Sequence, residues 1–509
     1  MILNQIDYIE KIKGCWNGKN IGGTLGAPFE CLRGTFDITG YVQEMKGDPF
    51  PNDDLDIQLV WLNAAEKYGK NVNSKILGEY WLNYITPHWG EYGAGKNNLR
   101  AGIVPPLSGS VNNIYKNSCG CFILSEIWAC LSPGHPEIAV KYAYEDGSVN
   151  HAEEGLFAEI FCAAVESAAF VESNIRKLID IGLSYIPIDC GVAKGINNVI
   201  ESFDKGLDWK QARKILLQTV PGSFGALGTP KMNIAEDEPV GEIGWDAPSN
   251  IGIIIVGLLY GESDFEKSLY ISAGCGEDAD CTAGTVGSIL GIIFGESGIP
   301  ESLSKPLGGK IKTLCINRAD LGLNIPKSTD ELSMRIARLL PMFMGPDLCN
   351  VITETNGYEI TTTDADRMKC SPVPVNAWYS DYFIDKLKSS QWTTEYDFVI
   401  YEARLSYDGE PYIGPGQSRK FTLTIRNNIL MQQWINIKWY LPNNWTISPN
   451  RQMSFSLEQF YCNIGIQKIE FVITASEEID ASNEVLISIS SVGHHSHGVV
   501  PIKLFTRCE

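Results

Sequence analysis

The chain has 509 residues, of which 61 are acidic and 41 basic, so its formal net charge is −20. This excess of acid argues against a nucleic-acid partner, because such binding needs basic patches. The length predicts two domains. We see no signal peptide at the N-terminus, and the longest apolar run, at 250–261, is too short to span a bilayer. We therefore expect a cytoplasmic protein with no membrane partner.

Fourteen cysteines are scattered along the chain, most of them in apolar stretches that resemble helices. None forms a CxxC pair, and Cys119 and Cys121 are two positions apart. In a long chain without an export signal, this pattern favours free buried thiols over disulfides. It agrees with a reducing, cytoplasmic compartment.

Residues 1–345 are predicted to be helical. Apolar and small side chains recur at three- and four-residue spacing in 56–69 and 153–171, while strand-like alternation is scarce. Glycines recur every fourth residue in 14–26, so they share one helix face, where another backbone can pack closely. We expect an all-α domain over 1–345.

The pattern changes near residue 395. Short alternating runs rich in β-branched and aromatic residues follow, separated by turn signals, and they predict an Ig-like β-sandwich over 395–509. The stretch 346–394 has little regular pattern, and we interpret it as a connector. The stretch 97–113 is rich in Gly, Pro, Ser and Asn, and it is either a cleft-lining loop or an ordinary one.

Two clusters of carboxylates stand directly before apolar helices. Asp278 and Asp280 precede one helix, and Asn52, Asp53 and Asp54 precede another. A helix dipole contributes at most about 1 kcal/mol to such groups, too little to offset their mutual repulsion. A metal ion would offset it. Oxygen ligands favour Mg²⁺, one or two ions, with Mn²⁺ possible, although each cluster alone also fits a solvated helix cap.

Four stretches in this order resemble the motifs of the ADP-ribosylglycohydrolase family, which includes the dinitrogenase reductase-activating glycohydrolases and the J1 crystallins. They are "GGTLGAPFE" at 22–30, "NDDL" at 52–55, "SVNH" at 148–151 and "GEDADCTAG" at 276–284. The resemblance implies an all-α fold around one or two metal ions, so the chain would be an all-α ADP-ribosylglycohydrolase-like domain followed by the β-sandwich.

The resemblance also implies a function for individual residues. The metal ligands would be Asn52, Asp53, Asp54, Asp278 and Asp280. Glu30 and Asp54 would be catalytic, and Glu30, Ser148, His151 and Gly276 would bind substrate. The reaction would be metal-assisted hydrolysis of an N- or O-glycosidic bond, in a small-molecule or ADP-ribosylated substrate.

Four departures from the family pattern bear on the metal. Gly23 replaces an aspartate, and Asn52, Leu55 and Cys281 replace threonines, although Asn52 can still supply an oxygen. Since a thiol is a poor ligand for a hard cation, one metal site is expected to be weaker, or only one ion to bind. The departures also leave two alternatives: hydrolysis of another small glycoside or nucleoside-like compound, and a non-catalytic, crystallin-like structural or binding role.

Overall fold

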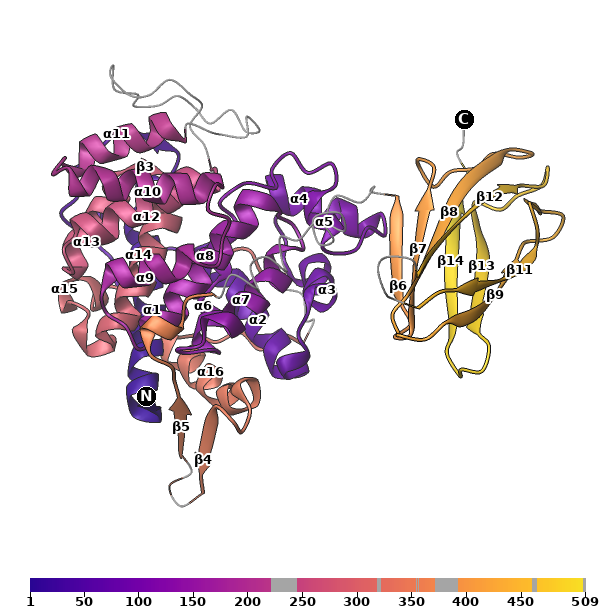
Figure 1. Ribbon diagram of the computed structural model, residues 1–509. Helices are drawn as coiled ribbons and strands as arrows, with labels where there is room; N and C mark the ends of the chain where they lie inside the picture. Colours follow the sequence, from indigo (N-terminus) through magenta and orange to yellow (C-terminus); the bar gives the residue numbers. More distant parts are fainter. Residues whose placement is uncertain are drawn as a thin grey trace. The chain divides into compact units, whose positions relative to one another are not determined.

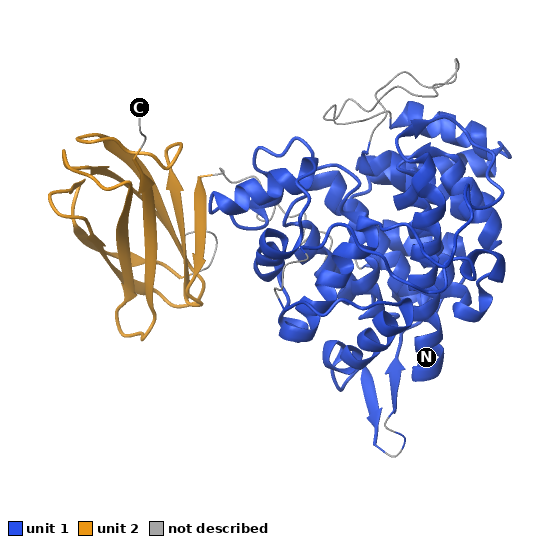
Figure 2. Ribbon diagram, turned by 180° about the vertical axis from the view of Figure 1, so that it is seen from behind, with its two compact units in different colours: residues 1–384 blue, residues 385–509 orange. Residues whose placement is uncertain are grey.

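The computed structural model describes residues 1–220, 245–317, 322–353, 355, 357–370, 392–459 and 465–506. It divides into two compact units, Met1–Ile384 and Asp385–Glu509, shown in blue and orange in Figure 2. The first is helical and the second is built from β-strands, as the sequence predicts. No helix in the described residues is both long enough and apolar enough to span a membrane.

The described part of the helical unit holds the following elements (Figure 1). Its helices are α1 (Gln5–Gly26), α2 (Asp53–Tyr68), α3 (Ser74–Tyr84), α4 (Gly90–Arg100), α5 (Leu107–Ser110), α6 (Glu126–Cys130), α7 (Pro136–Gly147), α8 (Glu153–Ala169), α9 (Ile175–Leu183), α10 (Gly191–Asp204), α11 (Trp209–Thr219), α12 (Ala247–Tyr260), α13 (Phe265–Gly274), α14 (Ala279–Phe294), α15 (Glu301–Ser304) and α16 (Thr329–Met344). Its strands are β1 (Ile2–Asn4), β2 (Leu32–Arg33), β3 (Gly276–Glu277), β4 (Cys349–Ile352) and β5 (Gly357–Thr361).

Helices α1 and α14 form the centre of this unit, and α14 also packs against α8, α12 and α13. The glycines of α1 face α14 without side chains between the two backbones. A Cβ atom built on Gly18 would lie 1.9 Å from the carbonyl oxygen of Gly287, and one on Gly22 would lie 2.1 Å from that of Ala283. The glycine repeat thus brings the backbone of α1 directly onto α14. This contact places the residues that end α1 beside the residues that begin α14.

Part of the predicted connector has regular structure and belongs to the helical unit. Strands β4 and β5 pair with each other, and β5 also pairs with β1 at the N-terminus, giving the antiparallel order β1-β5-β4. Tyr358 and Ile360 of β5 are buried with the helical core. The expectation of little regular structure in 346–394 is therefore corrected for β4 and β5, because the pairing of β5 with β1, at the other end of the unit, leaves no local pattern.

The second unit is an Ig-like β-sandwich, as predicted. Its strands are β6 (Thr393–Asp397), β7 (Tyr401–Tyr407), β8 (Ser418–Asn427), β9 (Gln433–Tyr440), β10 (Thr446–Ser448), β11 (Gln452–Leu457), β12 (Ile466–Thr474), β13 (Ser482–Ser491) and β14 (His497–Phe505). One sheet has the order β10-β12-β8-β7-β6 and the other β11-β9-β13-β14. Alternate side chains from both sheets form a separate core around Trp439 and Phe471.

The cysteines in the described residues carry free thiols, as the sequence predicts, and most of them are buried.

Candidate metal and substrate site

The starts of α2 and α14 meet, although they are far apart in the sequence. The side-chain amide of Asn52 donates a hydrogen bond of 3.2 Å to Oδ2 of Asp280. The side-chain oxygen Oδ1 of Asn52 accepts a hydrogen bond of 2.8 Å from the backbone N–H of Asp54, so Asn52 caps α2. Asn52 therefore joins the two helix starts. In this arrangement its oxygen caps the helix, so it is not oriented as the metal ligand that the resemblance implied.

Two groups of side chains offer ligand atoms that lie within 4.8 Å of one another, and they share Asp280. We call Glu30, Asp278 and Asp280 the Glu30 group, and Asp54, Asp280 and Cys281 the Asp54 group. Oδ1 of Asp280 is buried and accepts no hydrogen bond from the described residues. A buried carboxylate oxygen without a donor fits a position that a cation completes.

The Glu30 group opens into a cavity of about 1190 Å³. Asp53, the first residue of α2, also lines this cavity. Helix α4 and the turns after α5 form much of the remaining wall. The other lining side chains are polar or aromatic in large part, and they include His88, Trp89, Glu91, Tyr92, Asn97, Asn98, Asn112, Tyr115, Ser118, Cys119 and Trp245. The asparagines come from the stretch for which the sequence left a cleft-lining loop and an ordinary loop equally open.

The carboxyl groups of the site raise one another's pKa values. Desolvation within the cavity, together with the nearby Asp280 and Asp54 carboxylates, raises the pKa of Glu30 to about 8. Burial and neighbouring carboxylates likewise raise the pKa values of Asp53 and Asp278 well above the ordinary range. The cluster is thus short of positive charge. Its donor set, mostly carboxylate oxygen, fits a hard divalent cation.

Asp54 faces away from the cavity, although both a metal-binding and a catalytic role were expected of it. Oδ2 lies 3.3 Å from the ammonium nitrogen of Lys19, and Oδ1 accepts a hydrogen bond of 3.2 Å from the Cys281 thiol. The side chain is buried and is not among the described residues that line the cavity. Because one oxygen pairs with Lys19, the other accepts from Cys281 and the side chain does not line the cavity, we withdraw the catalytic assignment of Asp54.

Lys19 is a buried cation that the sequence analysis missed. Its ammonium group lies 2.7 Å from Oε1 of Glu126, in addition to its pair with Asp54. Glu126 also accepts hydrogen bonds from Ser288 and from Gln58. Burial disfavours the charged lysine, but the Glu126 and Asp54 carboxylates outweigh it and raise the pKa of Lys19. Lys19 is therefore paired with two carboxylates inside the helical core.

Three expected substrate ligands lie behind the cavity wall instead of lining it. His151 is fully buried: Nδ1 donates to Oδ1 of Asn150 at 2.6 Å, and Nε2 accepts from the Ser118 hydroxyl at 3.0 Å. Ser148 is also buried and bonds the backbone carbonyl of Glu145. Direct substrate contact is therefore withdrawn for His151 and Ser148. Burial lowers the pKa of His151 to about 3, so it is a neutral support for Ser118, which does line the cavity.

At position 276, the third of these residues, the backbone itself requires a glycine. Its φ is +65°, and a Cβ atom there would lie 2.2 Å from the carbonyl oxygen of Leu32. Gly276 pairs with Arg33 in the β2–β3 ladder and is buried. It therefore shapes the turn that presents Asp278, and its expected contact with substrate is withdrawn.

Glu91 is a candidate functional residue that the sequence reasoning did not find. It lies in the first turn of α4, lines the cavity and hydrogen-bonds with Ser118, the partner of His151. Burial raises the pKa of Glu91 to about 7. A carboxyl group with this pKa can donate or accept a proton near neutral pH. No local motif marks it, because it stands alone among glycine and aromatic residues in "HWGEYGAG".

The remaining carboxylates of the two acidic stretches are neutralised by other groups. Glu277 is buried against Arg33, whose Nε lies 2.8 Å from Oε1, and against Arg213 at 3.4 Å. Asp56 points away from the cavity and accepts hydrogen bonds from the backbone N–H groups of Leu314 and Cys315. The acidic residues at 277–280 therefore have two roles. Glu277 anchors the turn, and Asp278 and Asp280 face the cavity.

Comparison with known proteins shows the family of the helical unit. The family model of the ADP-ribosylglycohydrolases matches residues 4–330, more than half of the chain. The chain belongs to this family. No curated protein matches the chain at a significant level.

Several solved structures are similar to one or the other unit. An "ADP-ribosylglycohydrolase-related protein complex" is 18% identical with a TM-score of 0.43, and the match covers 66% of this chain and 99% of that one. A FixG-related protein from Vibrio parahaemolyticus is 10% identical with a TM-score of 0.18, covering 21% of this chain and 98% of that one. A PapD-like domain of human CEP192 is 14% identical with a TM-score of 0.16, covering 21% and 84%.

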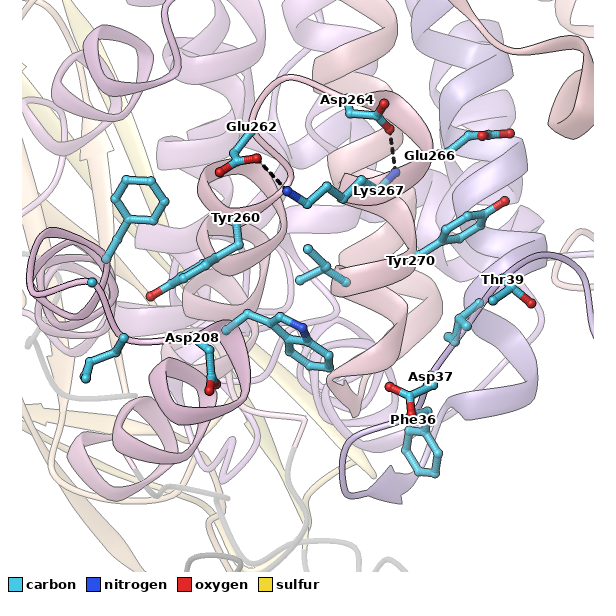
Figure 3. A pocket seen from close by; sticks show the side chains of 16 residues that line it. Phe36, Asp37, Thr39, Asp208, Tyr260, Glu262, Asp264, Glu266, Lys267 and Tyr270 are labelled. Atoms are coloured by element: carbon cyan, nitrogen blue, oxygen red, sulfur yellow. Dashed lines mark hydrogen bonds and ion pairs between the residues drawn. The ribbon is translucent and has the colours of Figure 1, made fainter.

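A second hollow lies elsewhere on this family member, between the α10–α11 turn, the α12–α13 turn and residues 36–39 (Figure 3). It is also rich in carboxylates, but these have local partners. Asp264 caps α13 by accepting from the backbone N–H of Lys267, and Glu262 pairs with the Lys267 ammonium at 2.6 Å. Asp208 caps α11 in the same way. Since these carboxylates are already satisfied, we place the functional site at the Glu30 group.

Proposed function

We propose that this member of the ADP-ribosylglycohydrolase family is a metal-dependent hydrolase that cleaves an N- or O-glycosidic bond of an ADP-ribosyl or related ribosyl substrate. The observation that carries the proposal is the convergence of Glu30, Asp278 and Asp280 on one wall of a large cavity. The unpartnered oxygen of Asp280 supports a bound cation there.

The chemistry follows from the residues at this wall. A divalent cation, Mg²⁺ or Mn²⁺, would be held by Asp278 and Asp280, with Glu30 and Asp53 as neighbouring carboxylates in the same cavity, and would supply polarisation of a water molecule and of ribose hydroxyls. Carboxylates beside the anomeric carbon stabilise the positive charge that develops on the sugar ring as the glycosidic bond breaks. Glu30 and Glu91 line the cavity where they can take a proton from water or give one to the leaving group.

A second candidate is hydrolysis of an uncharged, nucleoside-like ribosyl compound, and one observation favours it. Among the described residues that line the cavity there is no lysine and no arginine, whereas several are acidic. An ADP-ribosyl group carries two phosphates, for which lysine and arginine are the usual partners. The Asn97 and Asn112 amides and aromatic walls instead suit sugar hydroxyls and a base.

A hydrolysis screen distinguishes these candidates. The full chain is incubated with Mg²⁺ or Mn²⁺ and with ADP-ribosylated arginine and serine peptides, ADP-ribosyl conjugates and nucleosides, and the released product is measured by chromatography. We expect turnover that a chelator abolishes and that Asp278→Asn reduces at least about a hundredfold. Glu262→Gln, in the hollow of Figure 3, is the matched control and should retain activity. Absence of turnover on every substrate would favour the crystallin-like alternative.

A further inference from the structure

The two groups of candidate ligands differ in how much positive charge they already hold. In the Asp54 group, Asp54 pairs with the Lys19 ammonium through one oxygen and with the Cys281 thiol through the other. In the Glu30 group, none of the three carboxylates pairs with a lysine or arginine in any ion pair found among the described residues. Lys19 therefore separates the groups electrostatically.

The protein is built to keep Lys19 in this position. The Lys19 side chain is 1% exposed and extends from α1 past Gly284 of α14. A Cβ atom at residue 284 would come within 3.3 Å of Cδ of Lys19 and 3.4 Å of Oδ2 of Asp54. Glu126 fixes the ammonium group from the other side at 2.7 Å. Two carboxylates thus hold the lysine, and the absence of a side chain at Gly284 leaves the space that it occupies beside α14.

The Asp54 group is in consequence a poor place for a second divalent cation. An ion there would share Asp54 with an ammonium group 3.3 Å from its oxygen, and the two like charges would repel in a buried setting. Its third ligand, Cys281, offers sulfur, which hard cations bind weakly. In the Glu30 group all three ligands are carboxylates, and none of them pairs with a lysine or arginine among the described residues, although Asp278 accepts a hydrogen bond of 2.6 Å from the Cys119 thiol. Asp280, which is 6% exposed and whose Oδ1 has no hydrogen-bond partner among those residues, belongs to both groups and is therefore available to an ion at the Glu30 group.

We propose that the Lys19 ammonium occupies the cation position of the Asp54 group, and that the chain accordingly binds one divalent cation, at the Glu30 group. This inference rests on the metal dependence of the proposed function, and it specifies which of the two groups takes the metal. It also assigns Lys19 as a positioning residue: its ammonium group pairs with Asp54 and Glu126 and leaves Asp280 to the ion.

Metal stoichiometry tests the inference without any substrate. The full chain is stripped with a chelator, dialysed against Mn²⁺ and analysed for bound metal, with titration calorimetry for affinity. We expect one ion per chain for the wild type and for Cys281→Thr. We expect two for the double variant Lys19→Met/Cys281→Thr, because it removes the ammonium group and supplies a hard oxygen. Lys11→Met is the matched control on α1, since Lys11 bonds only backbone carbonyls of α14 and should leave one ion.

Two further variants keep the test decisive if the Lys19 variants do not fold, which circular dichroism will show. Asp54→Asn should change Mn²⁺ affinity less than about threefold, whereas Asp278→Asn should weaken it at least about tenfold. The inference is overturned if the wild type binds two ions or none, if Cys281→Thr alone gains an ion, or if Asp54→Asn weakens binding as much as Asp278→Asn. Two bound ions with chelator-sensitive hydrolysis would leave the proposed function standing, whereas no hydrolysis of any ribosyl substrate would count against that function alone.

Discussion

Asp146 is a buried carboxyl group in the helical core, outside the proposed chemistry. Nε1 of Trp128 donates a hydrogen bond of 2.9 Å to its Oδ2, while its Oδ1 has no hydrogen-bond partner among the described residues. Burial raises the pKa of Asp146 to about 8. The folded state therefore holds this proton over a range of pH in which the unfolded chain, with an aspartate pKa of about 3.9, has lost it.

The raised pKa predicts a stability that falls as pH rises. Between about pH 4 and pH 8 the folded state binds more protons than the unfolded state, so the free energy of unfolding declines with pH. Asp146→Asn keeps an acceptor for Trp128 and removes the titration. We compare the unfolding free energy of Asp146→Asn with that of the wild type at each pH. This difference should favour the variant by at least about 1 kcal/mol more at pH 8 than at pH 5. Urea unfolding at both pH values measures this difference, with Asp366→Asn, at an exposed residue, as the control. An unfolding free energy that changes equally with pH in Asp146→Asn and in the wild type would contradict the prediction.

Glu91 supports a second prediction about a single residue. Replacing the carboxyl group by an amide in Glu91→Gln keeps the volume and the hydrogen bond with Ser118 but removes the exchangeable proton. We expect the rate of hydrolysis to fall by about 10²- to 10⁴-fold, because general acid–base catalysis contributes roughly that factor. Calorimetry should find Mn²⁺ affinity unchanged, since Glu91 belongs to neither group of candidate ligands. An equal loss of metal affinity would show that Glu91 acts through the cation instead.

At the scale of the elements, the packing of α1 against α14 restricts the sequence, because the close approach of the two backbones requires glycines in α1. The glycines of α1 meet carbonyl oxygens of α14, which are backbone atoms and cannot rotate out of the way. The site depends on this contact, because α1 carries Lys19 and leads to Glu30 while α14 carries Asp280. A change in the spacing of the two helices therefore changes the site as well as the core.

Gly18→Ala tests the helix contact. The added Cβ atom would lie 1.9 Å from the Gly287 carbonyl oxygen, so the helices must separate. We expect a loss of about 1–3 kcal/mol in the free energy of unfolding, as for other overpacked cores, despite the better helix propensity of alanine. The control is Gly78→Ala in α3, where the nearest atoms are the methyl groups of Leu99, which can rotate. Denaturant unfolding compares them, and equal losses would show that backbone proximity is not the cause.

At the scale of the whole molecule, the two units have separate cores. One hydrophobic cluster contains buried residues of the helical unit, and the other contains residues of β7 to β14 and the turns between them. The β-unit contributes no residue to the groups of candidate ligands, which all lie between Glu30 and Cys281.

Each unit is therefore expected to fold alone. A chain of residues 1–384 should keep its helical circular dichroism and its Mn²⁺ affinity, and residues 385–509 should give the spectrum of a β-protein with cooperative thermal unfolding, because each is large enough for its own core. Circular dichroism and calorimetry measure both. Insoluble 1–384, or loss of metal binding in it, would show that the β-unit covers or supports the helical one.

The local pattern of the sequence was enough to predict most of the helices and strands and to name some residues of the candidate site. Helical periodicity, strand alternation and the acidic helix starts depend on neighbouring residues, so they can be interpreted without a fold. The glycine repeat predicted a close helix contact for the same reason. Glu30, Asp278 and Asp280 were named on their motifs, and the structure places their oxygens within 4.8 Å of one another.

What only the tertiary structure decided is the direction in which each side chain points and what faces it. Asp53 and Asp54 are neighbours in the sequence, but successive side chains of a helix turn by about 100°, so one lines the cavity and the other faces Lys19. Lys19 of α1 and Asp54 of α2 meet beside Gly284 of α14, which lies far from both in the sequence. His151 lies in a matching motif yet is buried behind Ser118, and Glu91 reaches the cavity without any motif. These facts depend on packing between distant segments, which no local pattern encodes.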